Sequence, residues 1–267
     1  MAEPKSYLEK VEADLIAKEQ KVEEQNKGAE KVKFILVGVL LGLWFVGLLV
    51  LTGFRYIPNG QYVTAIQQLE NGNFKEAALA FEKLDGRGSS EYYLDIIYAQ
   101  HPQYKLINAT VGEMVNFGMY NQEQNIAPIE WFVIAKDANK ALLVSKHIID
   151  AQPYSGTVSL PIWLEETFRK SAFNDKESLG VTEVLLLSRE QIDTYLKGQE
   201  FAKCEPTTFA RSRGYSTNYA SNYMWWTSES SSGGKHFVAS QSGYLGRDVA
   251  DDTKTNGVRP AIWVSFE

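Results

Sequence analysis

Cysteine is almost absent from the 267-residue sequence, which contains only Cys204. A single cysteine cannot form a disulfide within the chain, and a zinc site with four cysteine ligands is excluded as well. A lone cysteine is more often a small buried hydrophobic residue than a nucleophile. A catalytic Cys204 would also need a neighbouring base, and the only histidines are His101, His147 and His236.

The chain also has no excess of basic residues over acidic ones. The chain has 27 Lys and Arg against 33 Asp and Glu, which gives a net charge of −6, and it contains no basic cluster. Proteins that bind nucleic acids normally carry a basic face. The composition therefore argues against a nucleic-acid partner, while a hydrophobic content of 44% is ordinary for a folded protein.

Familiar catalytic motifs do not occur. Without a Gly-x-Ser-x-Gly elbow or a His-Glu-x-x-His pair, a nucleophilic triad and a catalytic zinc site are unsupported. Glu165 and Glu166 are adjacent on an expected helix, so they point in different directions and do not form an acid/base pair. His236 and the nearby Ser230–Ser232 run are a weak basis for a hydrolase. The sequence predicts no catalytic residue, no metal and no cofactor.

One oxygen-rich segment, GRDVADDTKTNG, leaves a question open. Its side chains at Asp248, Asp251, Asp252 and Asn256 are of the kind that calcium prefers, but they do not have the EF-hand spacing. A solvated turn before the last strand is the favoured interpretation. Cation binding by the three aspartates stays an alternative.

A long hydrophobic run lies in the N-terminal part. Residues 34–54 contain no charged side chain, and about 20 apolar residues cross the roughly 30 Å hydrocarbon core of a bilayer. A cleaved signal peptide would have a shorter run and a small-residue cleavage site, so we expect an uncleaved transmembrane signal anchor. Three lysines at 27–33 precede the run and only Arg55 follows it closely. This bias predicts a single-pass cell-membrane protein with a cytoplasmic N-terminus and an extracytoplasmic C-terminal part.

The segment before this run, residues 1–33, is expected to be a charged cytoplasmic helix. Its few apolar residues near heptad spacing permit a coiled coil, but a solvated helix is favoured because few heptads fit. Within the run, Gly38 and Gly42 form a small-xxx-small pair. Such a pair is compatible with self-association or with partners in a membrane complex.

Residues 55–106 are expected to form short helices. The pattern LENGNFKEAALAFEKL resembles the tetratricopeptide helix-turn-helix, in which a glycine ends one helix and Ala and Phe pack the next. Asn71-Gly72-Asn73 predicts the turn, and Ser90 offers an N-cap for a third helix that runs to about Tyr98. There is room for only one repeat. A packing spacer is therefore favoured over a peptide-binding array.

Residues 107–267 form the largest expected globular part, and its class is α+β with mainly antiparallel strands. Two helices are expected. One is LPIWLEETFRKSAF, which offers Ile162, Leu164 and Phe168 to a core, and the other is SREQIDTYLKG, with Ser188 as its cap and Gly198 as its end. KDANK predicts a hairpin turn. The expected strands are EMVNFGMY, IEWFVIA, KALLVSK, EVLLLS, HFVASQS and VRPAIWVSF.

Several of these segments also occur, in one order, in a known family. VGEMVNFGMY, PIEWFVIAKDANKALLVSKHIIDAQPY, WLEETFRKSAF, VLLLS, CEPTTFARSRG, WW and GVRPAIWV resemble a bacterial domain family of unknown function whose members typically carry a WWLRSPG … GVRPALWI-like signature. The resemblance implies a C-type-lectin-like or formylglycine-generating-enzyme-like fold. That fold has a small twisted antiparallel sheet, two flanking helices and long loops over one face.

The chain departs from this family after its tryptophan pair. Thr227-Ser228-Glu229-Ser230 stands where the family has LRSPG, so the arginine and the Pro-Gly turn are missing. The paired or copper-binding cysteines of formylglycine-generating enzymes and the calcium-binding triplets of lectins are missing as well. The resemblance therefore brings no activity with it.

A non-catalytic recognition module that binds an extracytoplasmic glycan or protein is the function that the sequence favours. The stretch 214–247 is rich in Tyr, Ser, Asn and Gly, the residues of adaptable binding loops, and aromatic faces suit sugar rings. We expect Tyr219, Tyr223 and Tyr244 to be partly exposed and Trp225, Trp226 and Trp263 to be mostly core. A structural subunit of a membrane assembly and, less favoured, an enzyme on the same fold are the alternatives. The candidate ligand-binding residues are Tyr215, Tyr219, Tyr223, Thr227, Glu229, His236, Tyr244 and Arg247.

Overall fold

The structure is a computed structural model that describes residues 17–18, 60–123, 125–174, 180–214, 223–245 and 249–267. The expected transmembrane segment 34–54 and nearly all of the expected charged helix 1–33 lie outside the described residues. The chain forms two compact units, residues 1–64 and 65–267. In the first unit the described residues, 17–18 and 60–64, are helical. The helices among the described residues are all too short or too polar to span a bilayer.

The second unit begins with the predicted short helices. Residues 65–70 are helical, and helix α2 (Phe74–Glu82) follows the predicted turn, where Gly72 has a φ of 77°. Ala77, Ala78 and Phe81 are buried, as their helical spacing predicts. Helix α3 (Ser90–Gln100) is also confirmed, but Ser90 is its first residue. Ser89 occupies the N-cap, without a side-chain capping hydrogen bond.

These helices are joined closely to the strands that follow. The 3₁₀ helix η1 (Pro102–Ile107) carries Leu106, which is buried in the same core cluster as the strand residues. Glu82 accepts hydrogen bonds from the Tyr98 hydroxyl of α3 and from the Asn108 amide. Lys136, on strand β2 (Ile126–Lys136), donates to the carbonyls of Ile107 and Ala109. The 3₁₀ helix η1 therefore shares the core of the strands, and hydrogen bonds join α2 and α3 to the segment before β1.

The first sheet contains five antiparallel strands in the order β1-β2-β3-β10-β5. It confirms the strands expected around residues 113–120, 129–135, 140–146 and 183–188 and most of the last one. The Asp137 carboxylate accepts from the amides of Asn139 and Lys140, which fixes the predicted hairpin turn. The strands are β1 (Met114–Asn121), β2 (Ile126–Lys136), β3 (Lys140–Ser145), β5 (Val181–Leu185) and β10 (Ala261–Ser265).

A second five-stranded sheet has the order β4-β9-β6-β7-β8, with a parallel contact between β6 and β9 at Trp225 and Gly257. One small sheet was expected from the family resemblance, so two sheets are a correction. The predicted strand VRPAIWVSF is split, because Pro260 cannot donate to a ladder and the chain changes sheets there. The strands are β4 (Asp150–Pro153), β6 (Met224–Ser231), β7 (Lys235–Ser240), β8 (Val249–Asp251) and β9 (Thr255–Val258).

The two predicted helices of this part are confirmed. One runs through α4 (Leu160–Trp163), the π-helical turn η2 (Leu164–Phe168) and α5 (Arg169–Ala172). Leu164 and Phe168 are buried as expected, whereas Ile162 is 55% exposed, so its assignment to the core is wrong. The other is α7 (Arg189–Tyr195), which Ser188 and Gln191 begin with a reciprocal capping box. Two short elements, η3 (Glu200–Ala202) and α8 (Thr208–Ser212), were not expected.

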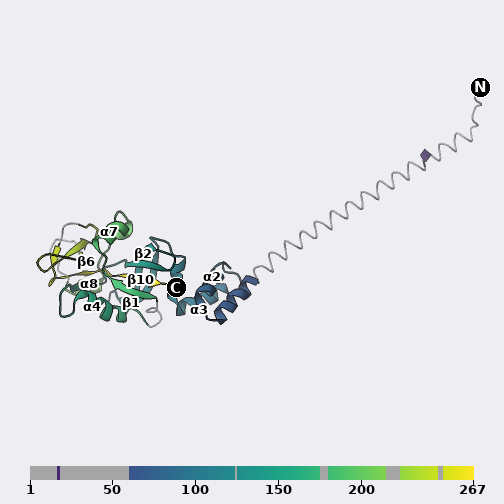
Figure 1. Ribbon diagram of the computed structural model, residues 1–267, viewed down its shortest axis with the longest axis horizontal. Helices are drawn as coiled ribbons and strands as arrows, with labels where there is room; N and C mark the ends of the chain where they lie inside the picture. The colour runs from purple at the N-terminus through teal and green to yellow at the C-terminus, as the bar shows by residue number, and fades with distance from the viewer. Residues whose placement is uncertain (1–16, 19–59, 124, 175–179, 215–222, 246–248) are drawn as a thin grey trace, which may run out of the picture. The chain divides into compact units, whose positions relative to one another are not determined.

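The first sheet has a buried core on both faces, because side chains alternate along its strands. In β3, Leu143 packs in one cluster with Phe168, whereas Leu142 and Val144 pack in another with Ile192 of α7. Figure 1 shows α7 above and α4 below the strands β6 and β10. The fold is therefore α+β, with the two helices on opposite sides of the strands.

Candidate functional site

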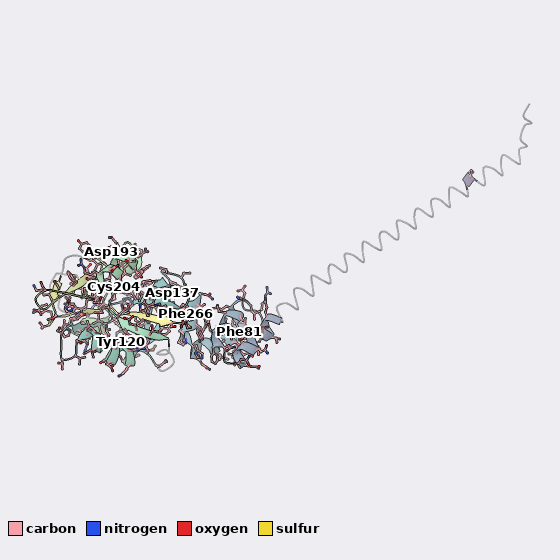
Figure 2. The ribbon with its side chains drawn as sticks, in the orientation of Figure 1. Phe81, Tyr120, Asp137, Asp193, Cys204 and Phe266 are labelled. Carbon is pink, nitrogen blue, oxygen red and sulfur yellow. The ribbon has the colours of Figure 1, made fainter. Side chains whose placement is uncertain are left out.

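Two neighbouring hollows lie where loops from different parts of the chain meet. The first has a volume of about 570 Å³ and the second of about 470 Å³. Phe132, Phe201 and Cys204 line the first, and Glu130, Thr207 and Arg211 line the second. Cys204 is labelled in Figure 2 within this part of the molecule.

His147 and Glu205 line both hollows and form the boundary between them. The chain around these two residues is held by backbone hydrogen bonds. The Ile148 amide donates to the Glu205 carbonyl at 3.1 Å, and the Thr207 amide donates to the Ile148 carbonyl at 2.9 Å. The two hollows are therefore parts of one site, which we call the double hollow.

The first hollow has an aromatic wall. Phe132 of β2 and Phe201 of η3 are stacked, with ring centroids 5.5 Å apart and planes at 30°. Cys204 beside them is 5% exposed, which confirms that it is a core residue. Burial raises the pKa of its thiol, so it is neutral at physiological pH and a poor nucleophile.

Charged groups of both signs surround the hollows, and several form pairs. Lys146 lies 2.8 Å from the Glu130 carboxylate, and the Arg211 guanidinium lies 3.9 Å from that of Glu205. The Glu205 side chain is 76% exposed, so its carboxylate remains accessible. A ligand that enters the second hollow would meet both donors and acceptors.

Among the described residues, His147 and Glu205 are the titratable side chains that line both hollows. Its Nδ1 lies 3.3 Å from the Glu205 carbonyl, and because a carbonyl can only accept, this nitrogen carries the proton in the neutral ring. Burial lowers the pKa of His147, and the Lys146 and Arg259 charges add to this, against the raising effects of the Glu205 carbonyl and Glu130. The neutral ring leaves Nε2 as an acceptor, 3.7 Å from Glu130.

Two of the sequence-predicted residues lie near the double hollow. The Tyr223 carbonyl accepts from the amide of Gln241, which lines the first hollow, and Arg211 lies over the Tyr223 ring. Tyr244 bonds through its backbone to Ser240, next to Gln241. Tyr223 is half-buried and Tyr244 is 69% exposed, as predicted. Tyr215, Tyr219 and Arg247 lie outside the described residues.

Three other predicted residues do not reach the hollows. Thr227 is fully buried, and its hydroxyl donates to the Phe237 carbonyl at 3.0 Å, so its assignment to a ligand-binding surface is wrong. The Glu229 carboxylate accepts from the Arg189 amide at the first turn of α7. It therefore caps a helix.

His236, the third of these residues, belongs to an aromatic cluster. Its ring stacks on Tyr154 with centroids 3.5 Å apart and meets the Trp226 ring edge to face. Burial lowers the pKa of His236, and the Asp252 charge opposes this. Its Nδ1 is buried and has no hydrogen-bond partner among the described residues.

The tryptophans divide as follows. Trp225 and Trp226 are fully buried, which confirms that prediction, and their indole nitrogens donate to the carbonyls of Ser240 and Gln152. Trp263 is only partly buried, so the prediction that it is mostly core is met in part, and the Lys140 ammonium lies over its ring. Trp225, Trp226 and Thr227 are therefore the buried part of strand β6, whereas Ser228 and Ser230 are exposed.

The described residues contain no group of three or more His, Cys, Asp or Glu side chains that could hold a metal ion. Asp248 lies outside them. The Asp251 carboxylate accepts from the amide and the hydroxyl of Thr253, and that of Asp252 accepts from the Ser155 hydroxyl. Asp251 therefore stabilises its own turn, and Asp252 joins this turn to Ser155.

Sequence reasoning missed the double hollow because its lining residues come from distant segments. His147 and Glu205 are separated by 58 positions and meet only through the folded backbone. The KH pair after a buried strand and the CEPTT motif were the only signals, and neither indicates contact with the other.

Comparison with known proteins gives no match for this chain among family models, curated proteins or solved structures. The candidate site therefore depends on its geometry.

Proposed function

We propose that the protein is a recognition module that binds an oligosaccharide in the double hollow. The observation that carries the proposal is the pair of adjoining hollows with a shared His147–Glu205 boundary. Adjoining hollows suit a ligand with at least two successive units.

The chemistry of the two hollows supports a sugar ligand. The stacked Phe132 and Phe201 rings offer an apolar surface to the C–H face of a sugar ring. Around the rings, His147 Nε2, the Glu205 carboxylate and the Arg211 guanidinium offer acceptors and donors for hydroxyl groups. The first hollow has mostly apolar walls with a few placed polar groups, as is typical of small-molecule sites, whereas the second is lined mainly by polar residues.

We further propose that residues 34–54 anchor this module to the cell membrane and that the module is extracytoplasmic. The uncharged run and the lysines before it support this arrangement. A C-type-lectin-like relationship is likewise a proposal, supported by the order of the quoted motifs and compatible with the α+β fold. Protease treatment of sealed cells checks the topology. Cleavage after residue 59 from outside is expected, and full protection would refute the orientation.

The binding proposal is tested by screening the full chain in detergent against oligosaccharides, including peptidoglycan fragments. His147→Asn and His236→Asn are a matched pair, because both histidines are half-buried and burial lowers the pKa of both. Asn at 147 can keep a hydrogen bond to the Glu205 carbonyl but loses Nε2. We expect His147→Asn to abolish binding and His236→Asn to leave it unchanged.

The reverse pattern would place binding at the 214–247 loops, as the sequence analysis predicts. If the wild type binds no oligosaccharide but binds a protein at the hollows, the ligand is a protein and the sugar proposal is refuted.

A further inference from the structure

Arg259 carries a fully buried guanidinium beside the first hollow. It follows β9 at the point where the chain passes from the second sheet to the first. It makes no ion pair with any carboxylate among the described residues, and burial lowers its pKa. Its Cζ lies 5.4 Å from the centroid of the Trp225 ring, which favours a cation.

Three carbonyl groups accept hydrogen bonds from this guanidinium. Nε donates to Ser145 at 2.9 Å, whereas Nη1 and Nη2 donate to Ala202 at 2.9 Å and Phe201 at 2.8 Å. Ser145 ends β3, and the other two belong to η3. One rigid planar group therefore joins two segments that are distant in the sequence.

Residues next to both bonded segments line the first hollow, which places His147 on one segment and Phe201 on the other. On one side, the Ser145 hydroxyl donates to the His147 carbonyl at 2.7 Å, which links the guanidinium to the boundary histidine. On the other side, Phe201 and Cys204 line the hollow directly. A buried charge is costly unless it is hydrogen-bonded, and here three carbonyls from two segments accept from the guanidinium. The use of arginine here thus indicates a geometric role.

We infer that Arg259 is a positioning residue for the double hollow. It fixes the separation between the His147 wall and the Phe201–Cys204 wall and so sets the width of the opening that a ligand enters. This inference rests on the proposed function for its ligand, but the width of the hollow can be measured without one.

The only cysteine of the chain provides that measurement, because Cys204 lies in the wall and is 5% exposed. Arg259→Lys keeps the charge but has a single ammonium that cannot reach both walls with fixed geometry. We expect thiol labelling of Arg259→Lys in the full chain to be faster than in the wild type by about tenfold, equivalent to about 1.4 kcal/mol. The faster labelling should already be seen without denaturant. Its rate should change little when urea is added, because a local opening exposes little new surface.

Val264→Ala is the matched control, because Val264 is a fully buried β10 residue of the other core cluster. It lowers global stability without touching either wall, so Cys204 labelling in this variant should rise only along with global unfolding. If Arg259→Lys does not fold, Arg259→Gln takes its place, since a neutral amide can donate to one wall and not to both.

Labelling that is unchanged in the Arg259 variant, or that follows global unfolding as in Val264→Ala, overturns the inference.

Binding gives the second measurement. The affinity for the oligosaccharide that the wild type binds should fall by about tenfold in Arg259→Lys and stay constant in Val264→Ala. Equal affinity would refute a positioning role. Failure of the wild type to bind any oligosaccharide refutes the proposed function alone, because the labelling result does not involve a ligand.

Discussion

Single side chains decide which polar groups of the MWWTSES strand are available to a ligand. Thr227 is fully buried and donates to the Phe237 carbonyl. Thr227→Val keeps the shape but leaves that interaction unmade, so we expect a loss of about 1 kcal/mol in the free energy of unfolding. Urea unfolding measures this loss, and ligand affinity should not change.

Thr182→Val is the control for this substitution, since Thr182 is exposed and its hydroxyl bonds only weakly to the Trp263 carbonyl at 3.3 Å. Thr182→Val should leave the free energy of unfolding almost unchanged. Loss of ligand binding by Thr227→Val at unchanged stability would restore the sequence-based assignment.

His236 makes stability depend on pH. Because burial lowers its pKa in the folded protein below the ordinary 6.5, the unfolded chain takes up a proton first as the pH falls. The folded protein therefore loses stability as the pH falls below 6.5 and through the lowered folded-state pKa. His236→Phe keeps the stack on Tyr154 and removes the titration.

We expect the wild type to lose more stability than His236→Phe when urea unfolding at pH 7.5 is compared with unfolding at pH 5. The other histidines are present in both proteins, so their effects cancel in the difference. Parallel losses in the two proteins would show that His236 is equally easy to protonate in both states.

Residue burial was predictable where hydrophobicity and size agree. Trp225, Trp226, Leu164 and Phe168 are buried because large apolar side chains have no better place in a small fold. Ile162 is an exception and is exposed, because the helix that carries it has only one face toward the sheet. The burial of Thr227 depends on a carbonyl on the neighbouring strand, which no local pattern reveals.

At the scale of elements, one close approach fixes how a helix lies on the first sheet. Gly118, at the irregular point of β1, has a φ of 74°, and an added Cβ would lie 2.6 Å from the Phe173 ring and 2.8 Å from the Ala172 carbonyl. Both residues are at the C-terminal end of α5. Gly118→Ala should therefore cost about 3 kcal/mol of unfolding free energy, from overpacking together with backbone strain.

Gly233→Ala separates these two causes. Gly233 lies in the β6–β7 turn with a φ of 70°, and an added Cβ would meet nothing within 4 Å. Only the backbone strain remains there, at about 1 kcal/mol. Equal losses for the two variants in chemical denaturation would mean that α5 does not restrict β1.

Strand and helix positions were largely predictable, because alternation and helical spacing are local signals. The division into two sheets was not. Residues 255–265 form two strands of different sheets. The break at Arg259-Pro260 depends on which strands the residues on either side bond to, and this is not a local signal. The double hollow was unpredictable for the same reason, since its walls come from the β3–β4 connection, η3 and the loop after β7. Of the predicted stretch 214–247, Gln241 and Ser242 line the first hollow, and Tyr223 and Tyr244 are its outer neighbours.

At the scale of the whole molecule, the helices α2 and α3 behave as part of the sheet-containing unit in this structure. Residues 65–267 form one compact unit, and Glu82 of α2 joins α3 to the Asn108 amide ahead of β1. We therefore expect the most protected amides of α3 and β10 to exchange hydrogen through one global opening. Their exchange free energies and urea dependences should be equal.

Glu82→Ala is expected to uncouple the opening of α3 from that of β10, because it leaves the Tyr98 hydroxyl and the Asn108 amide without their shared acceptor. The α3 amides should then exchange through an opening with a smaller urea dependence, while the β10 amides keep the global one. Glu70→Ala, at an exposed position of the preceding helix, should leave both sets unchanged. Separate openings of α3 and β10 already in the wild type would contradict the single unit. The helices would then be an independent spacer between the N-terminal part and the double hollow.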